Sequence, residues 1–321
     1  MIPSVLIGLV LATTAVERPT VLIVQGAAGD PEYQASFTQW AAQWRSASDK
    51  AGARSITIGD APKAGDTDHD RFMKALAQES SERAATLWVV MIGHGTFDGR
   101  EVKFNLRGPD VSGAELADWL KPLARPVVVL ACFSGSGPLI NRLSRRDRVI
   151  VTATKSGTEL NVARFGRYLA ETTSDPAADL DKDGQVSVLE AFLTASKRTA
   201  QSYRDQSRLA TEHALLDDNG DGLGTPAEWF QGVRAIRRAK NDAPLDGLRA
   251  GQIVLVPSDR ERNLPVEVRR RRDALELELG QLRDQKSKIP EPIYYSRLEK
   301  LLLELGRLYE QANALAPSQA R

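Results

Sequence analysis

Short runs of apolar and β-branched residues, each bounded by glycine or polar residues, recur along the first half of the chain at 20–25, 55–58, 87–92, 127–131 and 149–153. They lack the alternation of a half-buried strand, so they predict strands that are covered on both faces. Amphipathic stretches separate them. The aromatic stripe from Tyr33 to Trp44 is one helical face suited to packing on a sheet.

Strands and helices alternate over residues 20–175, which predicts an α/β fold with a mostly parallel sheet and helices on both faces. In such sheets, active sites lie beyond the carboxyl ends of the strands. Two local signals refine the pattern. The pair Asp98-Gly99 predicts a tight hairpin turn, and Ser112 with Glu115 predicts a capping box at the start of a helix.

The character of the chain changes after residue 175. Acidic loops between helices occupy 176–235, and 236–262 is a predicted linker in which the apolar run 253–256 predicts an edge strand. Leucines at near-heptad spacing over 263–316 predict a helical hairpin or a short coiled coil. That segment offers a surface for a partner or for self-association.

Charge and cysteine content limit the functional classes. The chain has 43 basic and 42 acidic side chains among 321 residues, so no basic field of the kind that binds nucleic acid is expected. The basic run 269–272 is predicted to be a solvated helix face. Cys132 is the only cysteine, which excludes an intramolecular disulfide.

The amino terminus resembles a short secretory signal. Residues 1–15 combine an apolar core with small residues before Glu17, although no basic residue precedes the core. We therefore expect a secreted or periplasmic protein, with a cytoplasmic location as the alternative if this segment is a buried strand or follows a misplaced start. No later run approaches the roughly 20 apolar residues that span a bilayer.

Two reactive side chains follow the central predicted strands. His94 follows 87–92 after one glycine, and Cys132 comes directly after 127–131, each beside small residues. A thiolate attacks carbonyl groups well, and a neighbouring imidazole can take the thiol proton and return it to the leaving amine. The alternative interpretation is an inert buried cysteine and an ordinary loop histidine. Both residues end buried strands at one edge, which favours the catalytic interpretation.

The motifs His94-Gly95 and Ala131-Cys132-Phe133-Ser134-Gly135-Ser136 resemble those of the caspase-like (clan CD) cysteine peptidases, and most closely the legumain family. The resemblance covers about residues 20–175. It implies a caspase-like α/β sandwich and a His94/Cys132 dyad, with an oxyanion hole formed by the backbone N–H groups of Gly95 and Cys132. The family's third, orienting residue lies after the first strand, where Gln25 stands nearby without a close match.

The chain departs from both family motifs around the cysteine. Leu130 and Phe133 replace the two glutamates of the legumain motif, and the caspase form Gln-Ala-Cys-Arg-Gly is absent. Neither asparagine nor aspartate specificity is therefore expected from the resemblance, and the preferred substrate residue stays open.

Two acidic loops match the 12-residue EF-hand pattern, and they start at residues 179 and 217. Calcium prefers six to eight oxygen ligands, which this spacing supplies, and a glycine at the sixth position permits the sharp turn. We expect a pair of helix–loop–helix calcium sites, the second of them tighter or weaker because of Gly224 and Pro226. The predicted Ca²⁺ ligands are Asp179, Asp181, Asp183, Gln185, Ser187 and Glu190, followed by Asp217, Asn219, Asp221, Leu223, Thr225 and Glu228.

The sequence thus favours an exported, Ca²⁺-binding cysteine endopeptidase that hydrolyses protein or peptide substrates through a thioester acyl-enzyme. One rival is a non-catalytic, calcium-dependent binding or scaffold protein built on a peptidase fold. Another is a transpeptidase, which shares the thioester chemistry and passes the acyl group to an amine.

Overall fold

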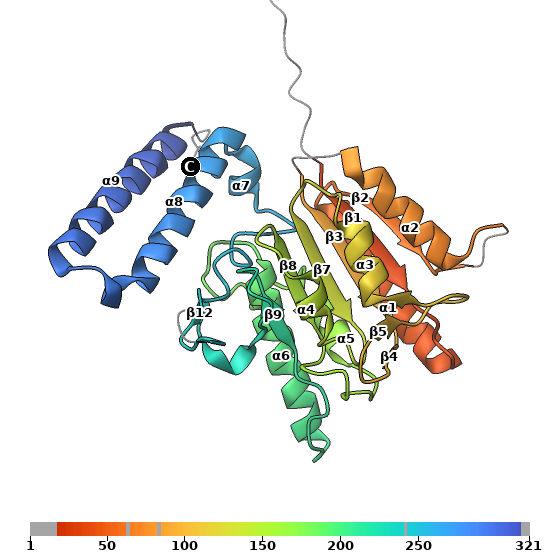
Figure 1. Cartoon of the computed structure of the whole chain (residues 1–321). Coiled ribbons are helices and arrows are strands. Elements are labelled where there is room, and N and C mark those ends of the chain that lie inside the picture. The colour runs from red at the N-terminus through yellow and green to blue at the C-terminus, as the bar shows by residue number, and fades with distance from the viewer. Residues whose placement is uncertain (1–17, 62–64, 82–84, 241–242, 316–321) are drawn as a thin grey trace, which may run out of the picture.

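A computed structural model describes residues 18–61, 65–81, 85–240 and 243–315 (Figure 1). The predicted signal segment 1–15 lies outside these residues. Among the described residues, no helix is both long and apolar enough to cross a membrane.

A central sheet of seven strands confirms the predicted α/β class, in the order β10-β9-β8-β7-β3-β1-β2. All five predicted strands are present and parallel: β1 (Thr20–Gln25), β2 (Arg54–Ile58), β3 (Leu87–Ile92), β7 (Val127–Cys132) and β8 (Arg148–Thr152). Two short antiparallel strands, β9 (Leu215–Asp217) and β10 (Thr225–Pro226), extend the sheet beyond β8.

Helices cover both faces of the sheet, and the two cores follow the alternation of side chains along each strand. In β1, Val21 and Ile23 belong to one core, whereas Leu22 and Val24 belong to the other. The first core is closed by α1 (Pro31–Lys50), α5 (Phe165–Thr172) and α6 (Val188–Asp205). The second is closed by α2 (Asp68–Gln78), α3 (Gly113–Leu120) and α4 (Leu139–Leu143).

Smaller elements surround this sandwich. The predicted turn at Asp98-Gly99 joins β4 (Gly95–Phe97) to β5 (Val102–Phe104), which pairs with β6 (Val111–Ser112). Ser112 and Glu115 form the predicted capping box of α3. A second hairpin consists of β11 (Phe230–Gln231) and β12 (Arg234–Ala235). The 3₁₀ turns are η1 (Glu79–Ser81), η2 (Pro176–Ala178), η3 (Ala227–Trp229) and η4 (Lys286–Lys288).

The C-terminal segment folds as α7 (Asp259–Asn263), α8 (Val266–Asp284) and α9 (Glu291–Leu315). Leu275 and Leu279 of α8 bury their side chains against Leu305 of α9, and the two helices form a hairpin that projects from the sandwich (Figure 1). The predicted leucine face is therefore the face that packs.

Two expectations for the second half of the chain were wrong. The run 253–256 forms a single isolated bridge, between Val254 and Ser187, in place of an edge strand. The second acidic loop lies between β9 and β10, so it is not a helix–loop–helix unit. The physical reason is the free edge of β8, which β9 completes through pairs such as Ile150 with Asp217.

Candidate active site

The central strands place His94 and Cys132 at one edge of the sheet. Strands β3 and β7 are neighbours, and their register sets Ile92 opposite Cys132. His94 therefore follows, by two residues, the position paired with the cysteine. Both side chains belong to the face of the sheet that α1 covers, since the His94 ring lies 5.2 Å from the Phe37 ring and Cys132 shares a core with Phe37.

The His94 imidazole is held between an aromatic wall and a backbone carbonyl. Its ring meets the Tyr33 ring edge-on, at a centroid distance of 5.0 Å. Its Nε2 atom lies 3.1 Å from the carbonyl oxygen of Ala28, in the turn after β1. A carbonyl can only accept, so the hydrogen bond assigns the proton to Nε2 and leaves Nδ1 as an acceptor.

The backbone contact of the His94 ring comes from Ala28, three residues after Gln25. The Gln25 side chain is buried and its Nε2 lies 3.4 Å from Thr38 Oγ1, so it serves the packing of α1. Sequence reasoning missed Ala28 because a backbone carbonyl has no residue-type signature. The small residues 26–29 after the first strand were the available signal, since they let the chain turn back toward His94.

The Cys132 thiol is covered. Its residue is 1% exposed, and a Cβ built on Gly166 of α5 would come within 2.7 Å of the Cys132 Cβ. Burial, together with a smaller effect of the nearby Glu212 carboxylate, raises the pKa of the thiol to about 12. In this conformation the sulfur is a neutral thiol at physiological pH.

We expect Cys132 to react slowly with iodoacetamide at neutral pH. A pKa of about 12 means that the thiolate fraction, and with it the rate, rises about tenfold per pH unit up to at least about pH 10, whereas a free cysteine levels off above about 8.5. Mass spectrometry of the labelled protein measures this profile. A rate at pH 7 above that of free cysteine would contradict the covered thiol.

Gly166 is the contact through which α5 covers the thiol. Replacing Gly166 by valine is expected to lift α5, to accelerate alkylation of Cys132 by about tenfold or more, and to destabilise the fold by about 1–3 kcal/mol through overpacking. The matched control is Gly306→Val in α9, where an added Cβ meets nothing within 4 Å. Equal alkylation rates in the two variants would show that Gly166 does not control access.

The expected oxyanion donor Gly95 is also engaged. Its N–H donates to Ser134 Oγ at 3.2 Å, and a Cβ at this position would lie 2.4 Å from the ring of Phe133. Phe133 is fully buried and packs on Phe104, at a centroid distance of 5.0 Å. Phe133 thus holds the turn in the second core, and only glycine fits beside it.

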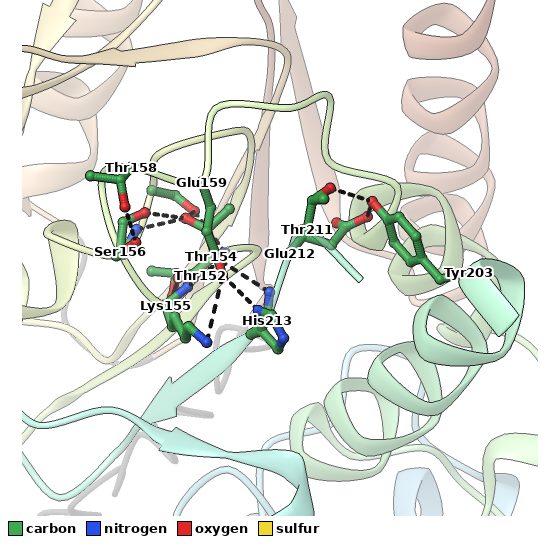
Figure 2. Close-up of polar contacts among 12 residues, drawn as sticks. Thr152, Thr154, Lys155, Ser156, Thr158, Glu159, Tyr203, Thr211, Glu212 and His213 are labelled. Carbon is green, nitrogen blue, oxygen red and sulfur yellow. Dashed lines mark hydrogen bonds and ion pairs between the residues drawn. The ribbon is translucent and has the colours of Figure 1, made fainter. Parts of the chain in front are cut away.

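A buried carboxylate that sequence reasoning missed lies behind Cys132. Glu212 accepts the N–H groups of Arg164 and Phe165, at 2.9 and 3.0 Å. It also accepts the hydroxyl of Tyr203 at 3.0 Å (Figure 2). Burial raises the pKa of Glu212 against the lowering effect of these donors. Because Phe165 begins α5, Glu212 caps the helix that covers the thiol.

A second polar contact links the loops around the edge. The Glu159 carboxylate accepts the backbone N–H groups of Lys155 and His213, and its Oε1 atom lies 2.6 Å from His213 Nδ1 (Figure 2). The Glu159 carbonyl accepts the N–H of Gly135, in the turn after Cys132. This cluster therefore joins the loop after β8, the loop after α6 and the cysteine turn.

A groove of about 690 Å³ opens beside the histidine. Tyr33 and Trp40 of α1 form one wall, and Arg164, Tyr168 and Tyr203 form the other. Tyr33 also touches the His94 ring, and Trp40 packs near Gly166 over the cysteine. One wall of the groove is therefore built by residues that also pack on His94 and near the cover of Cys132.

The first acidic loop gathers its carboxylates. One oxygen from each of Asp179, Asp181 and Asp183 lies within 4.8 Å of the others, and Gly184 takes a positive φ of 90°. Burial raises the pKa of Asp181, and the neighbouring Glu190 and Asp183 raise it further. This is the charge concentration that a hard cation relieves.

Other predicted ligands of the first loop have partners. Glu190 Oε1 accepts the N–H groups of Leu180 and Asp181, and its Oε2 completes a capping box with Ser187. The Gln185 amide donates to Asp183. Glu190 thus closes the loop through hydrogen bonds. Its side chain would have to rotate before both carboxylate oxygens could bind a cation.

The second loop is less complete. Asp217 is buried, its Oδ2 atom has no hydrogen-bond partner among the described residues, and burial raises its pKa. The side chain of Asn219 accepts the backbone N–H of Asp221, and that of Asp221 accepts the backbone N–H of Leu223. Of the other predicted ligands, Thr225 donates its hydroxyl to Asp246, and Glu228 is exposed.

Comparisons with known proteins give likeness in structure only. No protein-family model matches the sequence, and no curated protein matches it. Among solved structures, the Drosophila initiator caspase Dronc is 14% identical, with a TM-score of 0.43, over 64% of this chain and 80% of the caspase. Caspase-1 from Spodoptera frugiperda is 12% identical, with a TM-score of 0.40, over 63% of this chain and 87% of that protein.

Proposed function

We propose that this protein is a cysteine peptidase of caspase-like fold that uses Cys132 as nucleophile and His94 as general base. The observation that carries the proposal is the arrangement of the two residues: each follows one of two paired central strands at the same edge, and the Ala28 carbonyl orients the histidine. The motif around Cys132 supports the same assignment.

The chemistry follows from the tautomer. With its proton on Nε2, His94 accepts the thiol proton at Nδ1, and Cys132 Sγ attacks the peptide carbonyl. The imidazolium then protonates the leaving amine as the C–N bond breaks, which leaves a thioester on Cys132. Water activated by His94 hydrolyses that thioester. The Gly95 N–H would stabilise the oxyanion once it gives up its hydrogen bond to Ser134 Oγ and donates to the substrate oxygen instead.

Because the Cys132 thiol is covered by α5, catalysis would also need a step in which this cover opens. Attack requires α5 to move away from Cys132, so that the sulfur meets the groove and loses the desolvation that raises its pKa. The Glu212 cap and the Glu159–His213 contact hold the covering segments in place. We propose that substrate engagement in the groove displaces them.

A peptide-library experiment tests this function. The whole protein is incubated with a mixed peptide library, with calcium and with chelator, and new termini are identified by mass spectrometry. We expect cleavage in the wild type and background in Cys132→Ala. Equal product from both proteins would refute Cys132 as the nucleophile, and no product from either would favour a non-catalytic binding protein.

The buried thiol favours one alternative, a calcium-dependent binding protein on an inactive peptidase fold. Its distinguishing feature is that Cys132 stays covered when a peptide binds the groove. Alkylation in the presence of groove-binding peptides separates the two functions, since a peptidase would show faster labelling and a binding protein would not.

We also propose that the first acidic loop binds Ca²⁺ through Asp179, Asp181, Asp183, the Gln185 carbonyl, Ser187 and Glu190, and that the second binds more weakly through Asp217, Asn219, Asp221, Leu223, Thr225 and Glu228. Three gathered carboxylates fit a calcium ion, as does the unpartnered Asp217 oxygen. Bound calcium would stabilise the loops that join α5 to α6 and β9 to β10.

Calcium is expected to raise the melting temperature, since a ligand at about 100 times its Kd stabilises the folded state by about 2.7 kcal/mol. Asp181→Asn should weaken calcium binding by at least about tenfold, because the substitution neutralises one of the three carboxylates that lie within 4.8 Å of one another. The control is Asp205→Asn at the exposed end of α6. Titration calorimetry measures both, and equal affinities would contradict the site.

A further inference from the structure

A cavity with several charged side chains in its lining lies away from the candidate active site. It measures about 870 Å³, within the range of small-molecule sites. One wall is the β11–β12 hairpin and the segment that follows it, and the other is the turn between α8 and α9 (Figure 1). The two walls are joined by Arg238, whose guanidinium makes a two-pronged ion pair with Asp284 and also donates to the Ala243 carbonyl.

The cavity concentrates positive charge in a protein that is otherwise balanced. The whole chain has a formal net charge of +1, yet four cationic and two acidic side chains line this cavity. Asp284 is already neutralised by Arg238. Arg234 and Arg283 make no ion pair with any described residue, and they face the cavity from opposite walls. Like charges in one concave surface repel each other and focus a positive potential.

The remaining lining is suited to an organic ligand. The Lys286 ammonium lies 5.5 Å from the centre of the buried Tyr294 ring, which holds it at the cavity, and it has no carboxylate partner among the described residues. Ile236, which is 56% exposed, adds an apolar surface on the opposite wall. The 25-residue helix α9 begins at Glu291 in the same lining, so its positive end adds to the field.

We propose that this cavity binds a small organic anion with at least two charged oxygen groups, phosphate or carboxylate. Arg234 would hold one group and Arg283 with Lys286 the other, while Ile236 packs on the carbon skeleton. Guanidinium groups suit this role because their planar donor pairs match the oxygens of both anion types. The ligand would thereby tie the helical hairpin to the sandwich.

Titration calorimetry of the full chain tests the site, with tripolyphosphate and with citrate as probes. We expect saturable binding of one anion per chain that weakens as salt is added. Which probe binds more tightly tells whether phosphate or carboxylate is preferred, and saturable binding of either supports the site. Failure of both to saturate at millimolar concentration overturns it.

Variants locate the binding. Arg234→Gln combined with Arg283→Gln should weaken the affinity for the probe by about tenfold or more, since each substitution removes a charge-assisted hydrogen bond to the anion. Arg307→Gln, an exposed arginine of α9 outside the cavity, removes the same kind of charge and should leave the affinity within about twofold. All three positions are exposed, so folding should be retained. Equal losses in the double variant and the control would overturn the assignment.

Discussion

Replacing His94 by alanine is expected to lower kcat for peptide cleavage by about 10²–10⁴-fold, the usual contribution of a positioned general base. The physical reason is that no other described group at this edge combines an acceptor nitrogen with the Ala28 hydrogen bond that directs it. The measurement is steady-state hydrolysis of the best peptide found in the library experiment.

Two further variants make this result specific to the dyad. Cys132→Ala combined with His94→Ala should be no less active than Cys132→Ala alone, because residues that act as a unit lose their effect together. His69→Ala is the matched histidine control, since its ring packs on Trp119 in the other core. Full activity of His94→Ala, or equal losses in His94→Ala and His69→Ala, would remove His94 from the mechanism.

Replacing Glu79 by alanine is expected to destabilise the protein by about 3–5 kcal/mol, the typical result of breaking a buried ion pair from one side. Glu79 is 2% exposed, and its Oε2 atom lies 2.5 Å from Nη1 of Arg125, whose side chain is fully buried. The same carboxylate also pairs with Arg54. Its loss leaves the Arg125 guanidinium in the interior without its carboxylate.

Denaturant unfolding of Glu79→Ala measures the loss. Asp66→Ala removes a carboxylate from an exposed pair with Lys74 at 2.8 Å and should cost less than about 1 kcal/mol. Glu79→Gln keeps a hydrogen-bond acceptor and should fall between the two. A change below about 1 kcal/mol for Glu79→Ala would show that solvent reaches the pair.

The sandwich could be predicted because its signals are local. The runs at 87–92 and 127–131 are short, apolar and rich in β-branched residues, which favours strands covered on both faces. The helical segments between the strands then favour the parallel pairing that the structure has. The turn at Asp98-Gly99 and the capping box at Ser112 depend on residues a few positions apart. Each is decided by side chains within one element.

The structure around the second acidic loop could not be predicted in the same way. The spacing from Asp217 to Glu228 matches a calcium loop, but the pattern records only which residues are present. Whether helices flank the loop depended on the unpaired edge of β8, more than 60 residues earlier in the chain, and pairing with it turned residues 215–217 into a strand. In the folded protein the Thr225 hydroxyl donates a hydrogen bond to Asp246.

By itself, the sequence determined the α/β class, the positions of His94 and Cys132 at the ends of two buried strands, and the leucine face of the hairpin, since hydrophobic periodicity encodes burial directly. Only the tertiary structure decided what surrounds the two reactive residues. The Ala28 carbonyl, the α5 cover over Cys132 and the Glu212 cap come from distant segments, and a backbone group or a glycine contact leaves no chemical pattern in the chain.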